Sequence, residues 1–454
     1  MFVPALLCNS GSDTMVSPAS HPLLLTLLLL SHFTFCISYS RPKALLAPIS
    51  YDESTSLYSI NLGNKNSLLL DLENSVFWID CVNTSYSSPT LSLVRCRSAV
   101  CNMASVCNSL ICDGGAPPGC STCYGPPSPV CQNSSCSPPI SNSAISTSTT
   151  STLWTDTFPV LSTDGRNPGS IVDVPNFPFA CADDLLIRNN SVPAGVVGDA
   201  ALSQAKIALP SQLAAKLSLK RKFTYCLPAT SNGKGVLFFG DSPIVFLPNI
   251  DFSNSFQYTP LLTDPSQPDS YMIDITGISV DGVKLNIDLN LLKIKDGTGS
   301  TVGGTIITST ERYTQLESSI YDELAREFKA AAHARGIKDA PAVSPFDTCF
   351  DGSTVSGTRL GAAVPEIDLS LKGSGGVVWR IFGANSVVSV QDDKVVCLAF
   401  LRRKQYETRA VVVGTFQQQD ALMQFDLATS RLGFLSSLLG SMATCSDFNF
   451  TSSV

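Results

Sequence analysis

Short apolar segments separated by turn residues recur along most of the chain. Segments of this length that are rich in Val, Ile, Leu, Phe and Thr, and bounded by Gly, Asn, Asp or Ser, are typical of β-strands. Helical periodicity is clear in only a few places, chiefly 211–219 and 318–336, and we expect His333 to be a surface residue of the second helix. The pattern predicts a mostly β chain. The predicted strands lie within 57–63, 67–73, 234–241, 271–283, 303–309, 410–416, 422–427 and 431–435.

The N-terminal 40 residues have a different character. An apolar run ends in small residues near Ser38–Ser40 and is typical of a secretory signal. The residues before it lack positive charge, so Met15 is a candidate for the true start. No later run is long enough to span a bilayer. We therefore expect residues 1–40 to be removed and the protein to be secreted into the apoplast or cell wall.

Export to an oxidising compartment predicts that the cysteines form disulfides. Fourteen of the 16 cysteines remain after the leader, 11 of them in 81–226 and three in 349–445. If all are paired, at least one disulfide must join the two halves of the chain. Cys349 with Cys397 is the preferred local pair, which leaves Cys445 to reach back. The predicted disulfide cysteines are Cys81, Cys96, Cys101, Cys107, Cys112, Cys120, Cys123, Cys131, Cys136, Cys181, Cys226, Cys349, Cys397 and Cys445.

Charge and histidine content exclude several classes of function. The formal net charge is −7 and no basic stripe is present, so we predict no nucleic-acid partner. Three histidines, two of them in the leader, are too few for serine-triad or metal-dependent hydrolysis. Cys120-Ser-Thr-Cys123 could mimic half a zinc site, but no histidine lies near it, and we expect no metal and no cofactor. Sequons for N-glycosylation lie at Asn83, Asn133, Asn189 and Asn449.

The length after the leader predicts two lobes rather than one core. We place the first at 41–245 and the second at 246–454, with the seam in the Pro-, Asn- and Ser-rich stretch that follows Gly240. Each lobe contains an apolar triplet followed by a turn, with Asp71 in the first lobe and Thr308 in the second. Each also ends in an apolar-apolar-Gly strand, at 194–200 and 410–416. This repetition indicates duplicated lobes that face each other.

Many longer motifs occur in a characteristic order, among them GVVGDAALSQAKIALPSQLA, LKRKFTYCL, GVLFFGD, GGTIITST, VSPFDTCF and QFDLATSRLGFLSSLLGS. In these stretches the chain resembles the plant xylanase-inhibitor, extracellular dermal glycoprotein and basic 7S globulin group of the pepsin-like aspartic peptidases. The resemblance covers nearly all of the mature chain. It implies a bilobal, mostly β fold with two β-rich lobes around a central cleft, and a monomer outside the membrane.

Pepsin-type catalysis needs two carboxylates that share one proton, one from an Asp-Thr/Ser-Gly turn in each lobe. Asp71 matches the first of them, but Leu72 and Glu73 replace the hydroxyl residue and the glycine of that turn. In the second turn Thr308 replaces the aspartate outright and Thr310 takes the place of glycine. We therefore expect Asp71 to be a vestigial, unpaired acid. Glu73 is an alternative second acid, but we expect it to project from its own lobe rather than across the cleft.

Two further segments bear on the active-site comparison. Proteolytic members carry a tyrosine in the flap hairpin, whereas 141–158, where we expect the flap, has none, and its nearest aromatic residue is Trp154. The FQQQ stretch at 416–419 resembles active plant peptidases, and we expect it to pack the last lobe strand away from the acids.

The resemblance implies a secreted, catalytically inactive protein that binds and inhibits a microbial glycoside hydrolase, a xylanase or a xyloglucan-specific endoglucanase. Such inhibitors insert a cation or imidazole between the hydrolase carboxylates. Xylanase inhibitors of the group carry a histidine at about the place of Ser441. The glucanase-inhibiting members carry one arginine at the place of Met442 and a second near Lys338, and neither arginine is present here. The best remaining basic candidates are in the 400–410 loop, Arg402, Arg403 and Lys404.

Two alternatives remain open. One is an aspartic endopeptidase with an atypical pair of acids, and the other is a storage or signalling globulin. The resemblance also implies one disulfide beyond the usual six, and we expect Cys112 to pair with Cys120 across a turn-rich loop.

Overall fold

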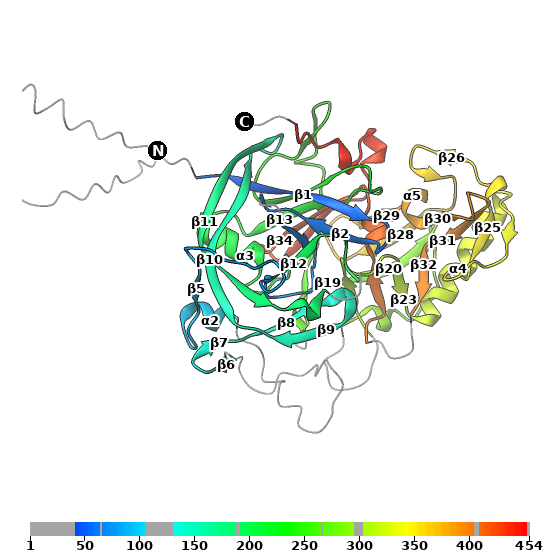
Figure 1. The fold of residues 1–454 in the computed structure, drawn as a ribbon. Coiled ribbons are helices and arrows are strands. Elements are labelled where there is room, and N and C mark those ends of the chain that lie inside the picture. The colour runs from blue at the N-terminus through cyan, green and yellow to red at the C-terminus, as the bar shows by residue number, and fades with distance from the viewer. Residues whose placement is uncertain are drawn as a thin grey trace, which may run out of the picture. The chain divides into compact units, whose positions relative to one another are not determined.

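β-Strands make up most of the regular structure, as the sequence predicts (Figure 1). The computed structural model describes residues 41–63, 66–104, 130–187, 191–264, 267–294, 303–403 and 408–451. Pro42–Val454 form one compact unit. The leader, Cys107, Cys112, Cys120, Cys123, Asn189 and Lys404 lie outside the described residues.

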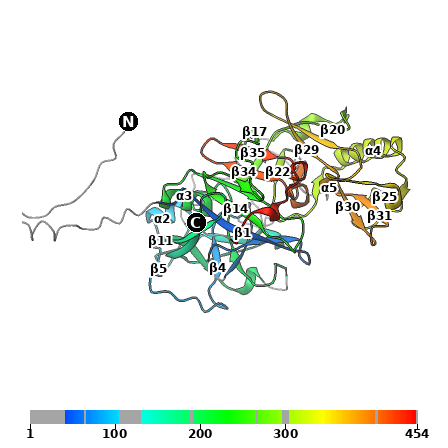
Figure 2. The same ribbon diagram turned by 90° about the horizontal axis from the view of Figure 1, so that it is seen from above.

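The largest sheet has 13 strands and is built from both halves of the chain. The last strands of the chain, together with β17 from the seam, extend one edge of it. β34 lies beside β13 (Figure 1), and β17, β35 and β34 lie next to one another in Figure 2. In spatial order the strands are β17 (Gln257–Pro260), β35 (Arg431–Leu435), β34 (Leu422–Asp426), β13 (Lys222–Cys226), β14 (Gly235–Gly240), β1 (Ala44–Asp52), β2 (Leu57–Ile60), β3 (Ser67–Leu69), β12 (Val196–Asp199), β4 (Trp78–Asp80), β11 (Pro168–Ala182), β10 (Leu153–Thr163) and β5 (Ser92–Leu93).

The second lobe is built on a six-stranded sheet and two four-stranded sheets. The six-stranded sheet contains β18 (Leu262–Asp264), β19 (Gln267–Ile273), β22 (Thr305–Ile307), β33 (Val411–Val413), β23 (Thr314–Leu316) and β32 (Phe400–Arg402). The others are β21 (Val283–Lys284), β20 (Ile275–Val280), β28 (Ile367–Leu371) and β29 (Val377–Ile381), and β24 (Asp339–Ala340), β25 (Cys349–Asp351), β31 (Val395–Leu398) and β30 (Val387–Val390).

Each predicted strand segment contains a strand, but the sequence pattern did not mark three long ones. These are β1, β10 and β11, and all three contain proline, for example Pro48, Pro159 and Pro175. Proline cannot donate to a strand ladder and so weakens the strand signal. In this fold β10 and β11 form a long antiparallel hairpin, in which Pro168 begins β11 and Pro175 lies at a register shift, whereas Pro159 and Pro178 are paired within the ladder.

Both predicted helices are present. Helix α3 spans Leu209–Leu217 and ends at Ser218, which takes the left-handed conformation. Helix α4 spans Ser318–Ala334, and the Glu317 side chain accepts the N–H groups of Ser319 and Ile320 at its start. Residues spaced three to four apart on α4 are buried, while His333 is exposed, as predicted. Two short helices, α2 (Ala99–Met103) and α5 (Gly383–Ser386), are the other α-helices of the described residues.

Five disulfides join described cysteines. Cys349–Cys397 links β25 to β31, and Cys226–Cys445 joins the two halves of the chain, as the parity of the cysteines predicts. The other three are Cys81–Cys181, Cys96–Cys131 and Cys101–Cys136. Within the described residues, no helix is long and apolar enough to cross a membrane.

Candidate functional site

The two turns singled out in the sequence occupy equivalent places in the two lobes. In the first lobe, the strand before the turn (β3) runs parallel to β12, and the strand after it (β4) runs antiparallel to β12. In the second lobe, likewise, β22 before the turn runs parallel to β33, and β23 after the turn runs antiparallel to β33. This repetition confirms the predicted duplication. We call Asp71-Leu72-Glu73 the first turn and Thr308-Ser309-Thr310 the second turn.

The two turns contact each other directly. The Leu72 N–H donates to Oγ of Ser309 at 2.9 Å. Leu72 has no hydroxyl with which to return an equivalent bond. Behind the second turn, Gln418 Nε2 donates to the carbonyl oxygen of Thr308 at 2.9 Å, and Gln418 Oε1 accepts from the Tyr225 hydroxyl. Part of the FQQQ stretch therefore supports the second turn directly, and the expectation that it lies away from the acids is wrong.

Asp71 is completely buried, and its carboxylate accepts three backbone N–H groups. Oδ1 accepts the N–H groups of Glu73 and Asn74 at 2.7 and 3.2 Å, and Oδ2 accepts the N–H of Ser143 at 3.3 Å. A general base must reach the water that it activates. Here the oxygen that would face that water is covered by the protein.

The cover over Asp71 is a separate two-stranded hairpin, which we call the flap hairpin (residues 139–150). It consists of β8 (Pro139–Asn142) and β9 (Thr147–Thr150), joined by the short 3₁₀ turn Ser143–Ile145. The carbonyl oxygen of Ser141 accepts from Asn74 Nδ2 and from Trp78 Nε1, both at 2.8 Å. These bonds hold the tip of the hairpin down on the first turn.

Only part of the segment expected to be the flap belongs to the hairpin. Trp154 lies in β10, where it is paired with Phe179 of β11 and Leu93 of β5. It is a sheet residue packed against the main core.

The position expected for Glu73 is wrong. Its carboxylate crosses to the opposite lobe, where Oε2 accepts from the Thr310 hydroxyl at 3.1 Å. The turn explains this direction, because the Asp71 carboxylate captures the N–H groups of residues 73 and 74 and rotates Glu73 out of strand geometry. Burial and the nearby Asp71 charge raise the pKa of Glu73 to about 7, although hydrogen bonds from Thr308 and Thr310 oppose the shift.

A third carboxyl group, which the sequence analysis did not single out, adjoins Asp71. Asp199 ends β12, is completely buried, and lies within hydrogen-bonding reach of the Asp71 carboxyl group. Its Oδ1 accepts the N–H of Ala201 at 2.7 Å. Burial, followed by the Asp71 charge, raises the pKa of Asp199 well above its ordinary value. A charged residue that ends a buried apolar strand was the available signal. We call Asp71, Glu73 and Asp199 the acid cluster.

A polar cleft of about 600 Å³ opens beside the second turn. Glu73, Asp269 and Glu311 contribute acidic side chains to its lining, and Arg403 and Arg409 contribute basic ones. The second turn supplies hydroxyl groups where a peptidase needs a carboxylate. Pepsin-type water activation uses one acid from each of the two turns, and the second turn supplies none among its described residues 308–310.

The basic loop has partners within the protein. Arg402 pairs with Asp322 at 2.6 Å and lies over the Tyr321 ring, with 4.8 Å from its guanidinium carbon to the ring centroid. Arg403 donates to the carbonyl oxygen of Arg409 at 2.5 Å and lines the polar cleft. These contacts direct both arginines to their own lobe.

Three of the predicted glycosylation sequons lie among the described residues. Asn83 and Asn133 are exposed, and Asn133 lies in the turn between two short strands, Cys131–Gln132 and Ser135–Cys136. Asn449 Nδ2 donates to Oδ1 of Asn167 at 2.9 Å. In the described parts of the chain, no group of three or more His, Cys, Asp or Glu side chains could hold a metal ion.

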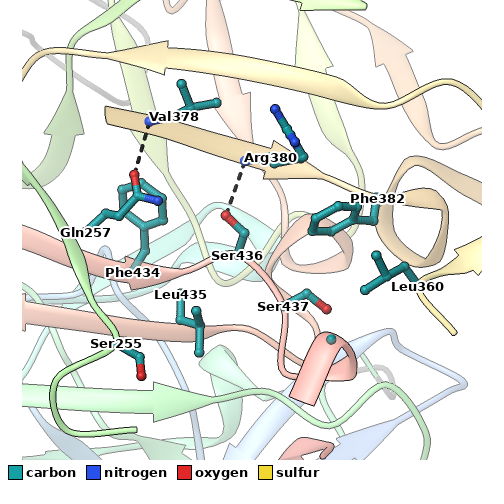
Figure 3. Close-up of a pocket in the computed structure, with 11 residues that line it drawn as sticks. Ser255, Gln257, Leu360, Val378, Arg380, Phe382, Phe434, Leu435, Ser436 and Ser437 are labelled. Atoms are coloured by element: carbon teal, nitrogen blue, oxygen red, sulfur yellow. Dashed lines mark hydrogen bonds between the residues drawn. The ribbon is translucent and has the colours of Figure 1, made fainter. Parts of the chain in front are cut away.

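A second cleft, of about 430 Å³, lies between β29, β17 and the end of β35 (Figure 3). The edge N–H groups of Val378 and Arg380 donate to Gln257 Oε1 and Ser436 Oγ, the two dashed bonds in Figure 3. Leu360, Phe382 and Phe434 give the cleft an apolar lining.

Two exposed side chains flank this second cleft. Gly440, which lines it, is followed two residues later by Met442, which is 75% exposed and takes the left-handed conformation. Leu360 follows Arg359, an exposed residue at the tip of the hairpin formed by β26 (Gly357–Thr358) and β27 (Gly361–Ala362). No described residue forms an ion pair with Arg359. We call Arg359, Leu360, Phe382, Gly440 and Met442 the rim surface.

Comparison with known proteins agrees with this geometry. The family descriptions "Xylanase inhibitor N-terminal" and "Xylanase inhibitor C-terminal" match residues 57–241 and 270–436. "Probable aspartic proteinase GIP2" of Nicotiana benthamiana is 40% identical over 450 residues, with 95% of this chain and 98% of the relative covered. "Gamma conglutin 1" of Prunus dulcis is 32% identical over 419 residues, with 91% of each chain covered.

Two solved structures share the fold. The structure titled "Crystal structure of edgp" superposes with a TM-score of 0.81 at 38% identity, covering 91% of this chain and 99% of that one. The basic 7S globulin from soybean superposes with a TM-score of 0.71 at 26% identity, covering 90% of this chain and 99% of that one.

Proposed function

Because the chain belongs to the xylanase-inhibitor family of pepsin-like proteins, we propose that it is a secreted, catalytically inactive inhibitor of microbial cell-wall glycoside hydrolases. The targets are a xylanase or a xyloglucan-specific endoglucanase. The observation that carries the proposed inactivity is the sealing of Asp71 by the flap hairpin, opposite a second turn that offers Thr308 instead of a carboxylate.

The rim surface has the features of a site that binds another protein. Exposed apolar side chains beside an apolar cleft are typical of protein interfaces. On the rim surface Met442 is 75% exposed, and Arg359 is an exposed cation on the neighbouring hairpin. Glycoside hydrolases carry two carboxylates in their active sites, so an exposed cation beside an apolar anchor is electrostatically complementary to them.

The rim surface is a better candidate than the basic loop. Arg402 would have to leave Asp322 and the Tyr321 ring before it could enter a partner. Arg359 gives up no ion pair within the described residues. Its hairpin is also held in place, because Leu360 N–H donates to Thr358 Oγ1 at 3.1 Å and Ala384 N–H donates to the Leu360 carbonyl oxygen at 2.8 Å. Preorganisation of this kind lowers the cost of binding.

The test is a titration of the purified protein against fungal xylanases and xyloglucan-specific endoglucanases, following polysaccharide hydrolysis. We expect near-stoichiometric inhibition of one class, and loss of inhibition by about tenfold or more in Arg359→Ala and Met442→Ala. Arg95→Ala and Leu93→Ala are matched controls, since both positions are exposed and lie in or just after β5, at the opposite edge of the 13-stranded sheet from the strands β17 and β35 that border the second cleft. The same preparation should not cleave protein substrates at acid pH.

The titration also separates the alternatives. Full inhibition by the wild type with unaffected rim variants would exclude the rim surface and leave the inhibitor function intact. Failure to inhibit any hydrolase would overturn the proposed function and favour a storage or signalling role, which the resemblance to conglutins and 7S globulins allows.

A further inference from the structure

The acid cluster and the flap hairpin meet at the Asp71 carboxyl group. Its Oδ2 accepts the Ser143 N–H from the tip of the hairpin. The same carboxyl group is within hydrogen-bonding reach of Asp199. Both acids are completely buried. Two ionised carboxylates in contact inside a protein repel each other strongly, and a shared proton removes this repulsion.

The second oxygen of Asp199 is poorly satisfied. Its Oδ1 accepts the Ala201 N–H, but Oδ2 is buried without a hydrogen-bond partner in the described residues. The Asn74 side chain favours the charged form of Asp199, but burial and the Asp71 charge outweigh it and raise the pKa of Asp199. A buried carboxylate oxygen without a donor is costly. A proton on Asp199 that it donates to Asp71 satisfies both groups, and leaves Asp71 ionised to accept the Ser143 N–H.

We propose that the flap hairpin is a proton-controlled latch: it stays docked while Asp71 and Asp199 share one proton, and it lifts from the cleft when that proton is lost. The latch would control the access of solvent and ligands to the cleft beside the two turns, whether or not the protein inhibits a hydrolase.

The flap hairpin is the element best able to yield when the proton is lost. Its strands pair only with each other, and a lone two-stranded hairpin is marginally stable in water. Asp71 and Asp199, by contrast, lie at the ends of strands in the middle of the 13-stranded sheet. Ile140 and Asn142 are buried, and Asn142 Nδ2 donates to the Leu186 carbonyl oxygen at 2.7 Å, so β8 stays anchored. Residues 143–145 are only half-buried, and the movement is confined to this tip, which admits water to the two carboxylates when it lifts.

The surrounding charges favour this response to pH. Glu73 is part of the cluster, Glu311 adjoins the second turn, and Asp269 of β19 faces the cleft, where it accepts from Ser75 at 2.8 Å. The cations in the same cleft are Arg403 and Arg409. Arg409 is held by Asp264 at 2.5 Å and Arg403 by the Arg409 carbonyl oxygen. The acidic side chains around the cluster add to the repulsion that arises when Asp71 and Asp199 are both ionised.

Amide hydrogen exchange of the intact protein tests the latch. We compare peptides covering 139–150 at about pH 5 and about pH 8, after correction for intrinsic exchange rates, and expect protection to fall by about tenfold or more at the higher pH. Peptides from α4 should keep their protection. In Asp199→Asn the pair cannot ionise fully, so the flap should stay protected at both pH values.

A second variant controls for buried acids in general. Asp420 is also a buried acid, but its carboxylate accepts the Cys445 N–H, and Asp420→Asn should leave the pH response of the flap unchanged. Equal flap protection of the wild type at both pH values would overturn the latch. So would loss of protection in Asp199→Asn equal to that of the wild type, or a parallel loss in α4, which would indicate general unfolding.

Discussion

The raised pKa of Glu73 makes stability depend on pH in a direction opposite to that of an ordinary salt-bridged acid. Its folded-state pKa of about 7 lies above its ordinary value of 4.5, mainly because burial disfavours the charge. The folded state therefore holds this proton more tightly than the unfolded chain does. The stabilisation is complete below about pH 4.5 and is lost as the pH rises through about 7.

Glu73→Gln isolates this effect. The amide has nearly the shape of the protonated acid, can still accept from Thr310, and cannot ionise. A shift from 4.5 to about 7 corresponds to about 3 kcal/mol at most. Because the side chain is partly exposed to the cleft, water screens part of the interaction, and we expect ~2 kcal/mol.

The assay is denaturant unfolding followed by tryptophan fluorescence, with the disulfides intact, at about pH 4.5 and about pH 8. The variant should match the wild type at the lower pH and be more stable by ~2 kcal/mol at the higher pH. Glu53→Gln, the same change at an exposed position, is the control and should show no such difference. Equal stability of Glu73→Gln and wild type at about pH 8 would refute the reasoning.

Three further outcomes follow from the site and its supports. Thr308→Asp restores the second acid but should not restore acid-pH cleavage of a protein substrate, because Asp71 stays covered; cleavage blocked by a statine-type inhibitor would contradict the seal. Gln418→Ala should cost about 2–3 kcal/mol in denaturant unfolding, since it leaves buried Thr308 and Tyr225 oxygens without their partner. Replacing Cys226 and Cys445 by serine opens a loop of 219 residues and should cost up to about 5 kcal/mol, whereas an unchanged midpoint would show that the disulfide adds no stability.

Local patterns predicted strands in both lobes and both main helices, because burial on one or two faces leaves a direct trace in the sequence. The pairing of β13 with β34 leaves no such trace, since it joins residues about 200 positions apart through backbone bonds that any residue can make. The sequence predicted a disulfide between the halves from cysteine parity alone. It could not show that the same region also shares a sheet.

The site was predictable in its composition but not in its geometry. The loss of the second acid at Thr308 could be inferred from the motif. The direction of Glu73 could not, because it depends on which N–H groups the Asp71 carboxylate captures. Asp199 was hidden for a different reason: the register places it opposite Leu69, two residues before Asp71, and only the parallel pairing of β12 with β3 makes them neighbours.

The strands β34 and β35 complete a sheet that also contains β1, the first described strand. During synthesis the ribosome delivers residues 422–435 only after residues 41–421 have been made. Until then β13 presents an unpaired edge, which is an aggregation hazard. The sheet of the first half is therefore incomplete until β34 has been made. A premature stop codon before β34 would leave the β13 edge unpaired rather than produce a complete N-terminal lobe.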